Sequence, residues 1–379
     1  MAAQRPALSK NKRIVIKIGS NVIASRDRGL NEVRLKEIAE ELSALRKEGY
    51  ELFVVSSGAI LCGTEKLGLS KPPQTIPMKQ AAAAVGQSRL MWAYEKYFEQ
   101  FGVKVAQILL THGDISDRKR FINARNTLMT LQEHGVLPII NENDTVTVSE
   151  LKLGDNDDLA AQTTHLVDAS LLIALSDVDG LYTEDPTLNP KAERIPLVEQ
   201  VNDKILAMAG DTGKQGGTGG MASKVKMAKN VASYGVTTLI ISGKTSGLIQ
   251  RAFQGEAVGT LFLPQSGRRS AKKQWIAHSL KTRGRLWLDE GAVEALLKKG
   301  RSLLPSGITQ VEGTFEVGDA VLCLSADGKE MAKGLTNYNA SEMIEIKGLR
   351  SAQIEETLGY KGMDEVIHRD NLVIFNDTA

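Results

Sequence analysis

The sequence predicts an α/β fold, in which a mainly parallel β-sheet lies between helices on both faces, followed by a smaller β-rich domain. Up to about residue 264, short apolar stretches alternate with helix-patterned segments, and glycine-rich or polar turns separate them. This alternation is typical of parallel strands joined by covering helices. Beyond residue 268 the pattern changes to short alternating strands and tight turns, so we expect a second domain there.

The elements of the first domain follow from apolar runs and from helical spacing. Short apolar runs predict strands at residues 13–18, 51–55, 103–110, 136–140, 169–175 and 237–241. Apolar residues that recur every three or four positions predict helices at residues 33–46, 80–101 and 121–134, and a further helix from Met221 onward.

A basic segment separates the two domains. Residues 268–304 hold ten lysines and arginines against three acids. We place the first domain at residues 1–265, a linker at 266–280 and the second domain with the C-terminal tail at 281–379. In the second domain, strands are expected at 314–324 and 331–335, on either side of the turn Ala326-Asp327-Gly328-Lys329.

Composition excludes several classes of protein. Of the 379 residues, 42% are hydrophobic and 24% are charged, which is ordinary for a globular protein, and the net charge of +2 says little about partners. Cys62 and Cys323 are far apart, which argues against a disulfide framework or a zinc site, and we expect no metal site built from the protein's own residues. The apolar runs are too short to span a bilayer, and Lys17 interrupts the first of them, so we expect a cytoplasmic protein.

Two polar clusters between Ile139 and Leu159 are the most informative local feature. The first reads Asn141-Glu142-Asn143-Asp144 after a predicted strand, and the second is Gly154-Asp155-Asn156-Asp157-Asp158. Open α/β sheets bind ligands where their strands end. Carboxylates this close repel one another unless a cation lies among them, and an amino group, a metal ion or nearby lysines would serve. We expect the substrate here.

A glycine-rich segment precedes the helix that starts at Met221. Residues 210–220 contain six glycines, and Lys224 follows within the first turns of the helix. Glycines let backbone N–H groups face an anion, and the helix N-terminus adds its dipole, so this segment predicts a phosphate site. A plain connecting loop is the alternative. Gly243-Lys244-Thr245 imitates the end of a P-loop, but the first glycine of that motif is missing, so we expect an ordinary turn.

Three other predicted strands end in polar residues. Lys17 lies near the end of the first strand, where burial is costly unless it meets an anion; a solvated strand end is the alternative. Ser57 ends the second strand just before a helix, which is again a ligand-binding position. Ser176 and Asp177 follow a later strand, where they would bind a metal or a nucleotide, or only form a turn.

These segments together resemble a known family. The blocks VIKIGSN, SSGAI, INENDTV, GDNDDLAA, SDVDGLYTEDP and GTGGMASK occur in the order found in the amino acid kinase superfamily, and they are most similar to its glutamate 5-kinase branch. The resemblance implies the amino acid kinase fold and phosphorylation of the γ-carboxylate of glutamate by ATP, at the start of proline biosynthesis. The later segment LDEGAVEALLKKGRSLLPSGI, followed by GTFEVGDAV, resembles a PUA domain.

The resemblance also implies roles for residues around the phosphoryl group. Lys17 and Lys224 match the two lysines that hold this group, and Asp157 matches the acid that keeps them in place. The ATP-binding segments match Lys17, Ser176, Asp177, Thr218, Gly219, Gly220, Met221, Ala222, Ser223 and Lys224. Ser176 stands where the family often has Thr, and Ala222 stands where it often has Ser or Thr. Both departures are small.

Further residues match the positions that bind the amino acid. These are Ser57, Asp144 and Asn156, with Asn141 and Asp155 expected beside them. The resemblance implies ATP with Mg²⁺ on its phosphates, proline as a feedback inhibitor, and assembly into homodimers or tetramers.

Two alternatives remain open from the sequence. The first is another member of the superfamily, such as an acetylglutamate, aspartate or uridylate kinase; the PUA-like segment favours the glutamate 5-kinase branch. The second is an RNA-binding or RNA-modifying protein, because PUA folds often bind RNA and residues 268–304 are basic. A solvated linker explains those charges more simply, and salt-dependent RNA binding would distinguish the two.

Overall fold

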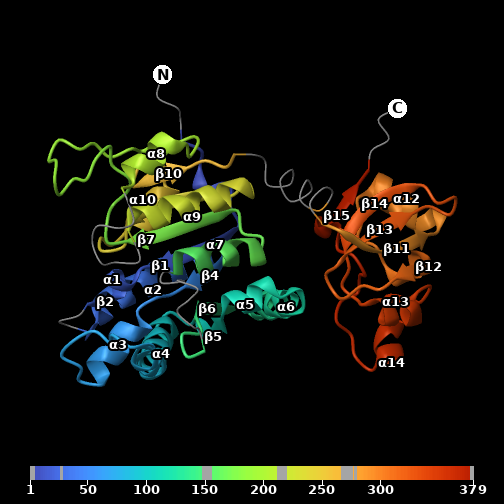
Figure 1. Ribbon diagram of the computed structural model, residues 1–379, viewed down its shortest axis with the longest axis horizontal. Helices are drawn as coiled ribbons and strands as arrows, with labels where there is room; N and C mark the ends of the chain where they lie inside the picture. The colour runs from blue at the N-terminus through green and yellow to red at the C-terminus, as the bar shows by residue number, and fades with distance from the viewer. Residues whose placement is uncertain are drawn as a thin grey trace. The chain divides into compact units, whose positions relative to one another are not determined.

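The computed structural model describes residues 5–25, 29–146, 156–210, 220–265, 276 and 280–375 (Figure 1). They form two compact units, one made mainly by residues before 268 and the other mainly by residues after it. Asp155, Thr218 and Gly219, which the sequence assigns to the site, lie outside the described residues.

The first unit is built on an eight-stranded sheet with the order β5-β6-β4-β1-β7-β9-β10-β8. Adjacent strands are parallel, except that β10 runs antiparallel to β9. This confirms the predicted mainly parallel sheet. The strands are β1 (Arg13–Ile18), β4 (Glu51–Val55), β5 (Lys104–Leu110), β6 (Val136–Glu142), β7 (Leu171–Ser176), β8 (Leu197–Val198), β9 (Thr237–Ser242) and β10 (Thr260–Phe262).

Helices connect most of these strands, and a small antiparallel pair, β2 (Ala24–Ser25) and β3 (Gly29–Leu30), follows the first helix. The helices are α1 (Ser20–Ile23), α2 (Glu32–Lys47), α3 (Ala59–Lys66), α4 (Ile76–Glu99), α5 (His112–Ser116), α6 (Arg118–Glu133), α7 (Asn156–Leu166), α8 (Asp203–Met208), α9 (Met221–Ser233) and α10 (Leu248–Phe253). The helix predicted at 80–101 begins earlier, because a proline is well accommodated in its first turn.

Helices cover both faces of the sheet, which explains why the central strands are buried throughout (Figure 1). Alternate residues of a strand point to opposite faces. In β1, Ile14, Ile16 and Ile18 share an apolar core with residues of α2, α4 and α10. Lys17 points to the other face, where α7 lies and where Asp157 meets it.

Helices α3 and α4 approach each other closely enough to require two glycines. A Cβ atom on Gly63 would lie 1.7 Å from the carbonyl oxygen of Ala82, and one on Gly86 would lie 1.8 Å from that of Ala59. Atoms that are not bonded cannot approach this closely, so both positions require glycine, which has no side chain. This contact fixes how α4 passes the start of α3, directly after β4.

The strand order makes the carboxyl end of β1 a natural ligand site. The chain places β4 on one side of β1 and β7 on the other, so the connections diverge there. Open α/β sheets bind ligands in the crevice at such a switch point. The carboxyl ends of β1, β4, β6 and β7 carry Lys17, Ser56-Ser57, Asn141 and Ser176, respectively.

The second unit has its own five-stranded sheet, with the order β12-β11-β13-β14-β15, and a separate apolar core. Its elements are β11 (Thr282–Leu288), α12 (Glu290–Lys299), β12 (Ile308–Gly313), β13 (Ala320–Leu324), β14 (Glu330–Leu335), α13 (Ala340–Ile346), α14 (Ile354–Leu358) and β15 (Leu372–Ile374).

One predicted strand of the second unit is wrong in part. The strand expected at 314–324 exists only from Ala320 onward. Before it the chain turns: Gly318 has a φ of +86°, and the Asp319 side chain accepts a hydrogen bond from the Glu316 N–H. The alternating pattern of this segment did not indicate the turn.

The two cysteines are free and buried, which is consistent with the expected lack of a disulfide framework.

Candidate active site

Two buried lysines meet one carboxylate at the end of β1. Lys17 Nζ lies 2.6 Å from Asp157 Oδ1, and Lys224 Nζ lies 3.6 Å from Asp157 Oδ2. At most 5% of any of these side chains is exposed. Burying charges is costly unless they are paired, and here both ammonium groups lie within ion-pair distance of the same carboxylate. The cluster therefore brings two ammonium groups together at one place, an arrangement that suits contact with an anionic ligand.

Asp157 reaches both lysines because it lies in the first turn of a helix. The sequence placed it in a polar cluster, but the structure starts α7 at Asn156, so Asp157 projects from a rigid element. Acidic residues are favourable in a first helical turn, which explains the local sequence. The apolar residues Leu159 to Ala161 that follow were the available signal for this helix.

Helix α9 brings the second lysine and a serine to the same carboxylate. Ser223 Oγ donates a hydrogen bond to Asp157 Oδ2 at 2.7 Å and lies 2.8 Å from the carbonyl oxygen of Gly220. Gly220 precedes the helix, and Met221 and Ala222 form its first positions. The first N–H groups of a helix lack intrahelical partners and attract anions. The described end of the glycine-rich segment thus presents backbone donors beside Lys224.

Asn156 joins the ends of two strands through one amide group. Its Nδ2 atom donates to the carbonyl oxygen of Ser56, to Ser57 Oγ at 3.0 Å and to Asn141 Oδ1 at 2.8 Å. Ser56 and Ser57 follow β4, and Asn141 lies in β6. The structure thereby brings together three of the residues expected to bind the amino acid. They lie directly beside Asp157, the next residue of α7.

Asn141 extends this group to helix α4, which the sequence did not reveal. Asn141 Nδ2 donates to Gln87 Oε1 at 2.8 Å, and Asn141 Oδ1 also accepts from the Glu142 N–H at 2.9 Å. Gln87 belongs to a long helix whose pattern suggests only packing, so no local signal marked it. Only the passage of α4 beside the strand ends brings it here.

Asp144 follows β6 and is largely removed from water. Burial raises the pKa of its carboxyl group from the ordinary 3.8 to about 6. A buried carboxylate that lacks a compensating charge is destabilised, and a cationic ligand would restore its ionised form. This environment fits a group that receives an ammonium ion.

Ser176 and Asp177 end β7 and connect to the chain after β1. Asn21 Nδ2 donates to Asp177 Oδ2 at 3.1 Å, and Ser176 Oγ donates to Asp177 Oδ1 at 3.2 Å. Burial alone would raise the pKa of Asp177, but the hydrogen bonds from Asn21 and Ser176 outweigh it, with help from Lys224, and lower the pKa. Asp177 is therefore a stable anion at neutral pH. The sequence assigned no role to Asn21.

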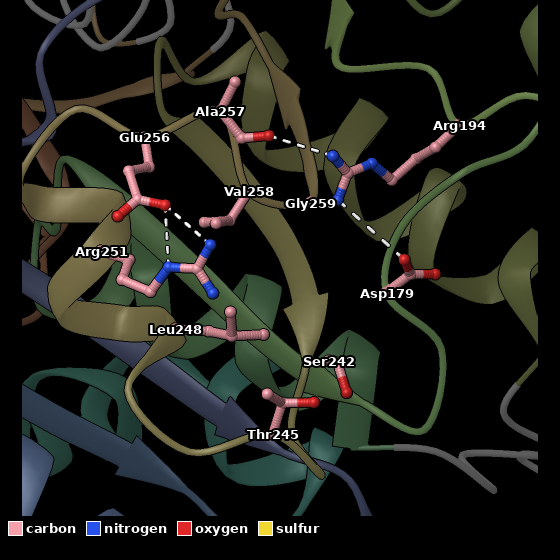
Figure 2. A pocket seen from close by; sticks show the side chains of 10 residues that line it. All are labelled: Asp179, Arg194, Ser242, Thr245, Leu248, Arg251, Glu256, Ala257, Val258 and Gly259. Atoms are coloured by element: carbon pink, nitrogen blue, oxygen red, sulfur yellow. Dashed lines mark hydrogen bonds and ion pairs between the residues drawn. The ribbon is translucent and has the colours of Figure 1, made fainter.

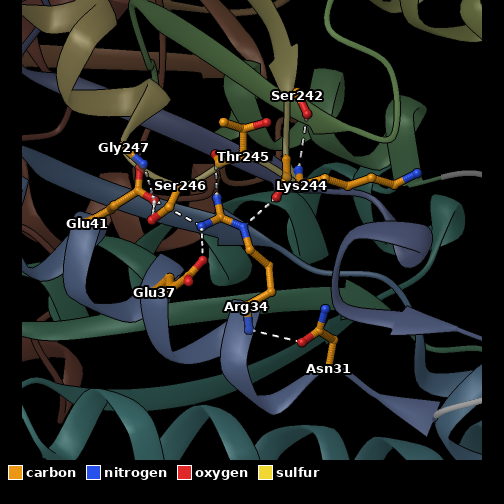
Figure 3. Close-up of polar contacts among 10 residues, drawn as sticks. Asn31, Arg34, Glu37, Glu41, Ser242, Lys244, Thr245, Ser246 and Gly247 are labelled. Atoms are coloured by element: carbon orange, nitrogen blue, oxygen red, sulfur yellow. Dashed lines mark hydrogen bonds and ion pairs between the residues drawn. The ribbon is translucent and has the colours of Figure 1, made fainter.

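A buried arginine of helix α2 holds the turn that follows β9, next to the end of β7 (Figure 3). Arg34 Nε donates to the carbonyl oxygen of Gly243 at 2.5 Å, and Nη2 donates to that of Thr245 at 3.3 Å. Its Nη1 atom contacts Glu37 Oε2 at 2.8 Å and Glu41 Oε1 at 3.1 Å. No motif in the sequence marks Arg34.

The braced turn supports the end of β7. The Gly243 N–H donates to the carbonyl oxygen of Ser176 at 2.6 Å. A Cβ atom at Gly243 would lie 2.5 Å from Val22 Cγ2, so the turn has no space for a side chain there. Gly243-Lys244-Thr245 is an ordinary strand-to-helix turn, as predicted, and it holds Ser176 in place.

A pocket of about 360 Å³ lies beyond this turn (Figure 2). Two ion pairs line it: Arg194 Nη1 lies 4.0 Å from Asp179 Oδ2, and Arg251 Nη2 lies 2.7 Å from Glu256 Oε2. Because these guanidinium groups already contact carboxylates, the pocket offers an anion little net positive charge.

The described residues contain no helix long and apolar enough to cross a membrane. They also contain no group of three or more acidic, histidine or cysteine side chains arranged to hold a metal ion.

Comparison with known proteins identifies the family. Residues 12–242 match the model of the amino acid kinase family, and residues 284–358 match that of the PUA domain. The chain is 51% identical over 367 residues to a glutamate 5-kinase of Geobacter sulfurreducens, covering 97% of this chain and 98% of that protein.

A glutamate 5-kinase of Syntrophotalea carbinolica is 50% identical over 371 residues, which cover 98% of this chain and 99% of that protein. A third glutamate 5-kinase, from Syntrophus aciditrophicus, is 47% identical over 375 residues, which cover 99% of this chain and 97% of that protein. The chain therefore belongs to the amino acid kinase family, within its glutamate 5-kinase branch, and carries a C-terminal PUA domain.

Proposed function

We propose that this protein transfers the γ-phosphoryl group of ATP to the γ-carboxylate of L-glutamate, giving L-glutamyl 5-phosphate and ADP, the first step of proline biosynthesis. The observation that carries the proposal is the buried cluster in which Lys17 and Lys224 share Asp157. The glutamate 5-kinases that match nearly the whole chain support the choice of substrate.

The chemistry requires alignment and charge neutralisation more than proton transfer. A glutamate side chain has a pKa of about 4.3, so at neutral pH its carboxylate is already a nucleophile. One carboxylate oxygen attacks the γ-phosphorus, the bond from that phosphorus to the β–γ bridging oxygen breaks, and the electron pair leaves with ADP. No general base is needed. The enzyme must bring two anions together and stabilise the transferring group.

The two lysines are proposed to supply this stabilisation. Lys17 and Lys224 approach from β1 and α9, and their ammonium groups would face the transferring phosphoryl group. Such preorganised charges act strongly in a site from which water is excluded. Asp157 is proposed to keep the two ammonium groups at a fixed separation, with Ser223 holding the carboxylate.

The remaining residues are proposed to hold the two substrates. Ser57, Asn141, Asp144, Asp155 and Asn156 would bind glutamate, with Asp144 facing the α-ammonium group. Ser176, Asp177 and residues 218–224 would bind ATP. Mg²⁺ would arrive on the ATP phosphates and neutralise part of their charge. Proline feedback, homo-oligomer assembly, a cytoplasmic location and the absence of RNA binding stay predictions.

The direct test is phosphoryl transfer from labelled ATP to glutamate, compared with aspartate and N-acetylglutamate. We expect efficient transfer to glutamate alone. Preferred transfer to either of the other acceptors would assign the protein to a different substrate in the same family.

The lysine roles have a sharper test. Lys17→Met and Lys224→Met are each expected to lower kcat by about 10²–10³, as for loss of one charge-stabilising donor, with little change in KM for glutamate. Lys226→Met is the matched control, because Lys226 is exposed two residues further along α9. A kcat near the wild-type value for either buried-lysine variant would contradict the proposal.

A further inference from the structure

A relay of amide groups runs from β4 to helix α4, and two backbone groups fix its direction. Asn156 donates to the carbonyl oxygen of Ser56, so its Nδ2 atom is identified without ambiguity. Asn141 Oδ1 accepts from both that Nδ2 atom and the Glu142 N–H. The other end of the Asn141 amide is therefore Nδ2, a donor, and it points to Gln87.

The direction of the relay decides what Gln87 presents. Because Asn141 Nδ2 donates to it at 2.8 Å, the facing atom of Gln87 must be Oε1. The Nε2 group, with two N–H donors, then points elsewhere. This nitrogen is buried, and it has no hydrogen-bond partner among the residues that the structure describes. Burying an amide without a partner is unfavourable, so such a group needs an explanation.

We propose that Gln87 is a specificity-determining residue whose Nε2 donates a hydrogen bond to the α-carboxylate of the amino acid substrate. This inference rests on the proposed function. The γ-carboxylate must reach the phosphoryl group at Lys17 and Lys224, on the face of the sheet that α7 covers. Gln87 comes from α4, which packs on the other face, so it suits the opposite end of the substrate.

The neighbouring residues support the α-end of the substrate. Asp144 follows Asn141 by three residues and is proposed to hold the α-ammonium group, which is bonded to the same carbon as the α-carboxylate. Gly86 packs closely against the backbone of Ala59, which brings α4 and the adjacent Gln87 near the residues that follow β4. An amide donor needs no ionisation to bind a carboxylate.

The test uses Gln87→Glu, which preserves the size of the side chain and the oxygen that accepts from Asn141. The change replaces the donor by a carboxylate oxygen that repels the substrate. We expect KM for glutamate to rise by about 10- to 100-fold, the size of a lost hydrogen bond to a charged group, with kcat and KM for ATP unchanged. Gln87→Met, which has no donor, should also raise KM for glutamate. Gln100→Glu is the matched control, because Gln100 is exposed at the end of the same helix.

A second substrate identifies which carboxylate is bound. Isoglutamine carries an amide in place of the α-carboxylate and keeps the γ-carboxylate. Gln87→Glu should therefore lose most of the preference of the wild-type protein for glutamate over isoglutamine. An unchanged KM for glutamate, an unchanged preference, or a parallel fall in kcat and thermal stability would overturn the role of Gln87. If the wild-type protein does not phosphorylate glutamate at all, the proposed function fails, and this inference fails with it.

Discussion

Asp144 shows how burial prepares a single residue for a ligand. In the unfolded chain its pKa is the ordinary 3.8, whereas in the folded protein burial raises the pKa to about 6. Between these values the folded state binds one proton more than the unfolded state. The contribution of Asp144 to stability is therefore present below pH 4 and is lost as the pH rises through 6. At neutral pH the buried charge destabilises the protein without its ligand.

Asp144→Asn should separate stability from substrate binding. At pH 7.5 we expect the free energy of unfolding to rise by about 1–3 kcal/mol, because the variant no longer buries a charge. At pH 4 this gain should disappear. KM for glutamate should rise, because the ammonium group loses its partner, with little effect on KM for ATP.

Urea unfolding at the two pH values and steady-state kinetics would measure these effects. The wild-type kcat/KM for glutamate should also fall as the pH drops below about 6, where Asp144 becomes protonated. Equal stability gains at both pH values, or an unchanged KM for glutamate, would show that Asp144 has another role.

At the scale of elements, a buried ion pair within helix α2 is hydrogen-bonded to the turn after β9. Arg34 and Glu41 are 4% exposed, and Glu41 Oε1 also accepts from the Gly247 N–H at 3.1 Å. Hydrogen bonds from this pair therefore join α2 to a turn that lies some 200 residues later in the sequence. Removing one partner of such a pair leaves an uncompensated buried charge.

Arg34→Met should accordingly destabilise the protein by about 3–5 kcal/mol in urea unfolding, since Glu41 would remain buried alone. Arg34→Met combined with Glu41→Leu should be much less destabilised, because neither charge remains. Arg251→Met is the matched control: Arg251 pairs with Glu256 at an exposed position, where the loss should stay below about 1 kcal/mol. A double variant as unstable as Arg34→Met would show that the carbonyl contacts of Arg34 matter more than its charge.

At the scale of the whole molecule, each unit has a core of its own. The core of the first unit joins β1, β4, β6, β7 and β9 to helices α2, α4 and α10, and that of the second contains only residues from Leu286 onward. A domain with its own core can in principle fold alone, so we expect each unit to do so. We propose that the catalytic domain spans residues 1–265, the linker 266–280, and the PUA-like domain with the tail 281–379.

A chain truncated after residue 265 tests these boundaries. We expect it to fold and to keep glutamate kinase activity close to that of the full chain, because every proposed site residue lies at or before Lys224. Circular dichroism would establish that it is folded, and the labelled-ATP assay would measure its activity. A folded but inactive truncated chain would show that the second unit takes part in catalysis.

The sequence by itself determined the order of elements and most of the candidate site. Helical and strand periodicity predicted the parallel sheet, because burial on both faces of a strand and on one face of a helix leaves a direct mark on the chain. The motifs also predicted Lys17, Lys224 and Asp157 for one site, and the ion pairs show that these three side chains lie together.

Only the tertiary structure decided which distant groups complete that cluster. Gln87, Asn21 and Arg34 lie in helices whose sequence shows nothing beyond ordinary packing or solvent exposure. Their positions depend on the strand order and on the close contact of α3 with α4, which are set by packing between segments far apart in the chain. The same limit explains the wrong strand at 314–319. There the Gly318 N–H donates to the carbonyl oxygen of Thr336, and the Thr336 N–H donates to that of Asp319, which favours a turn over the alternating pattern.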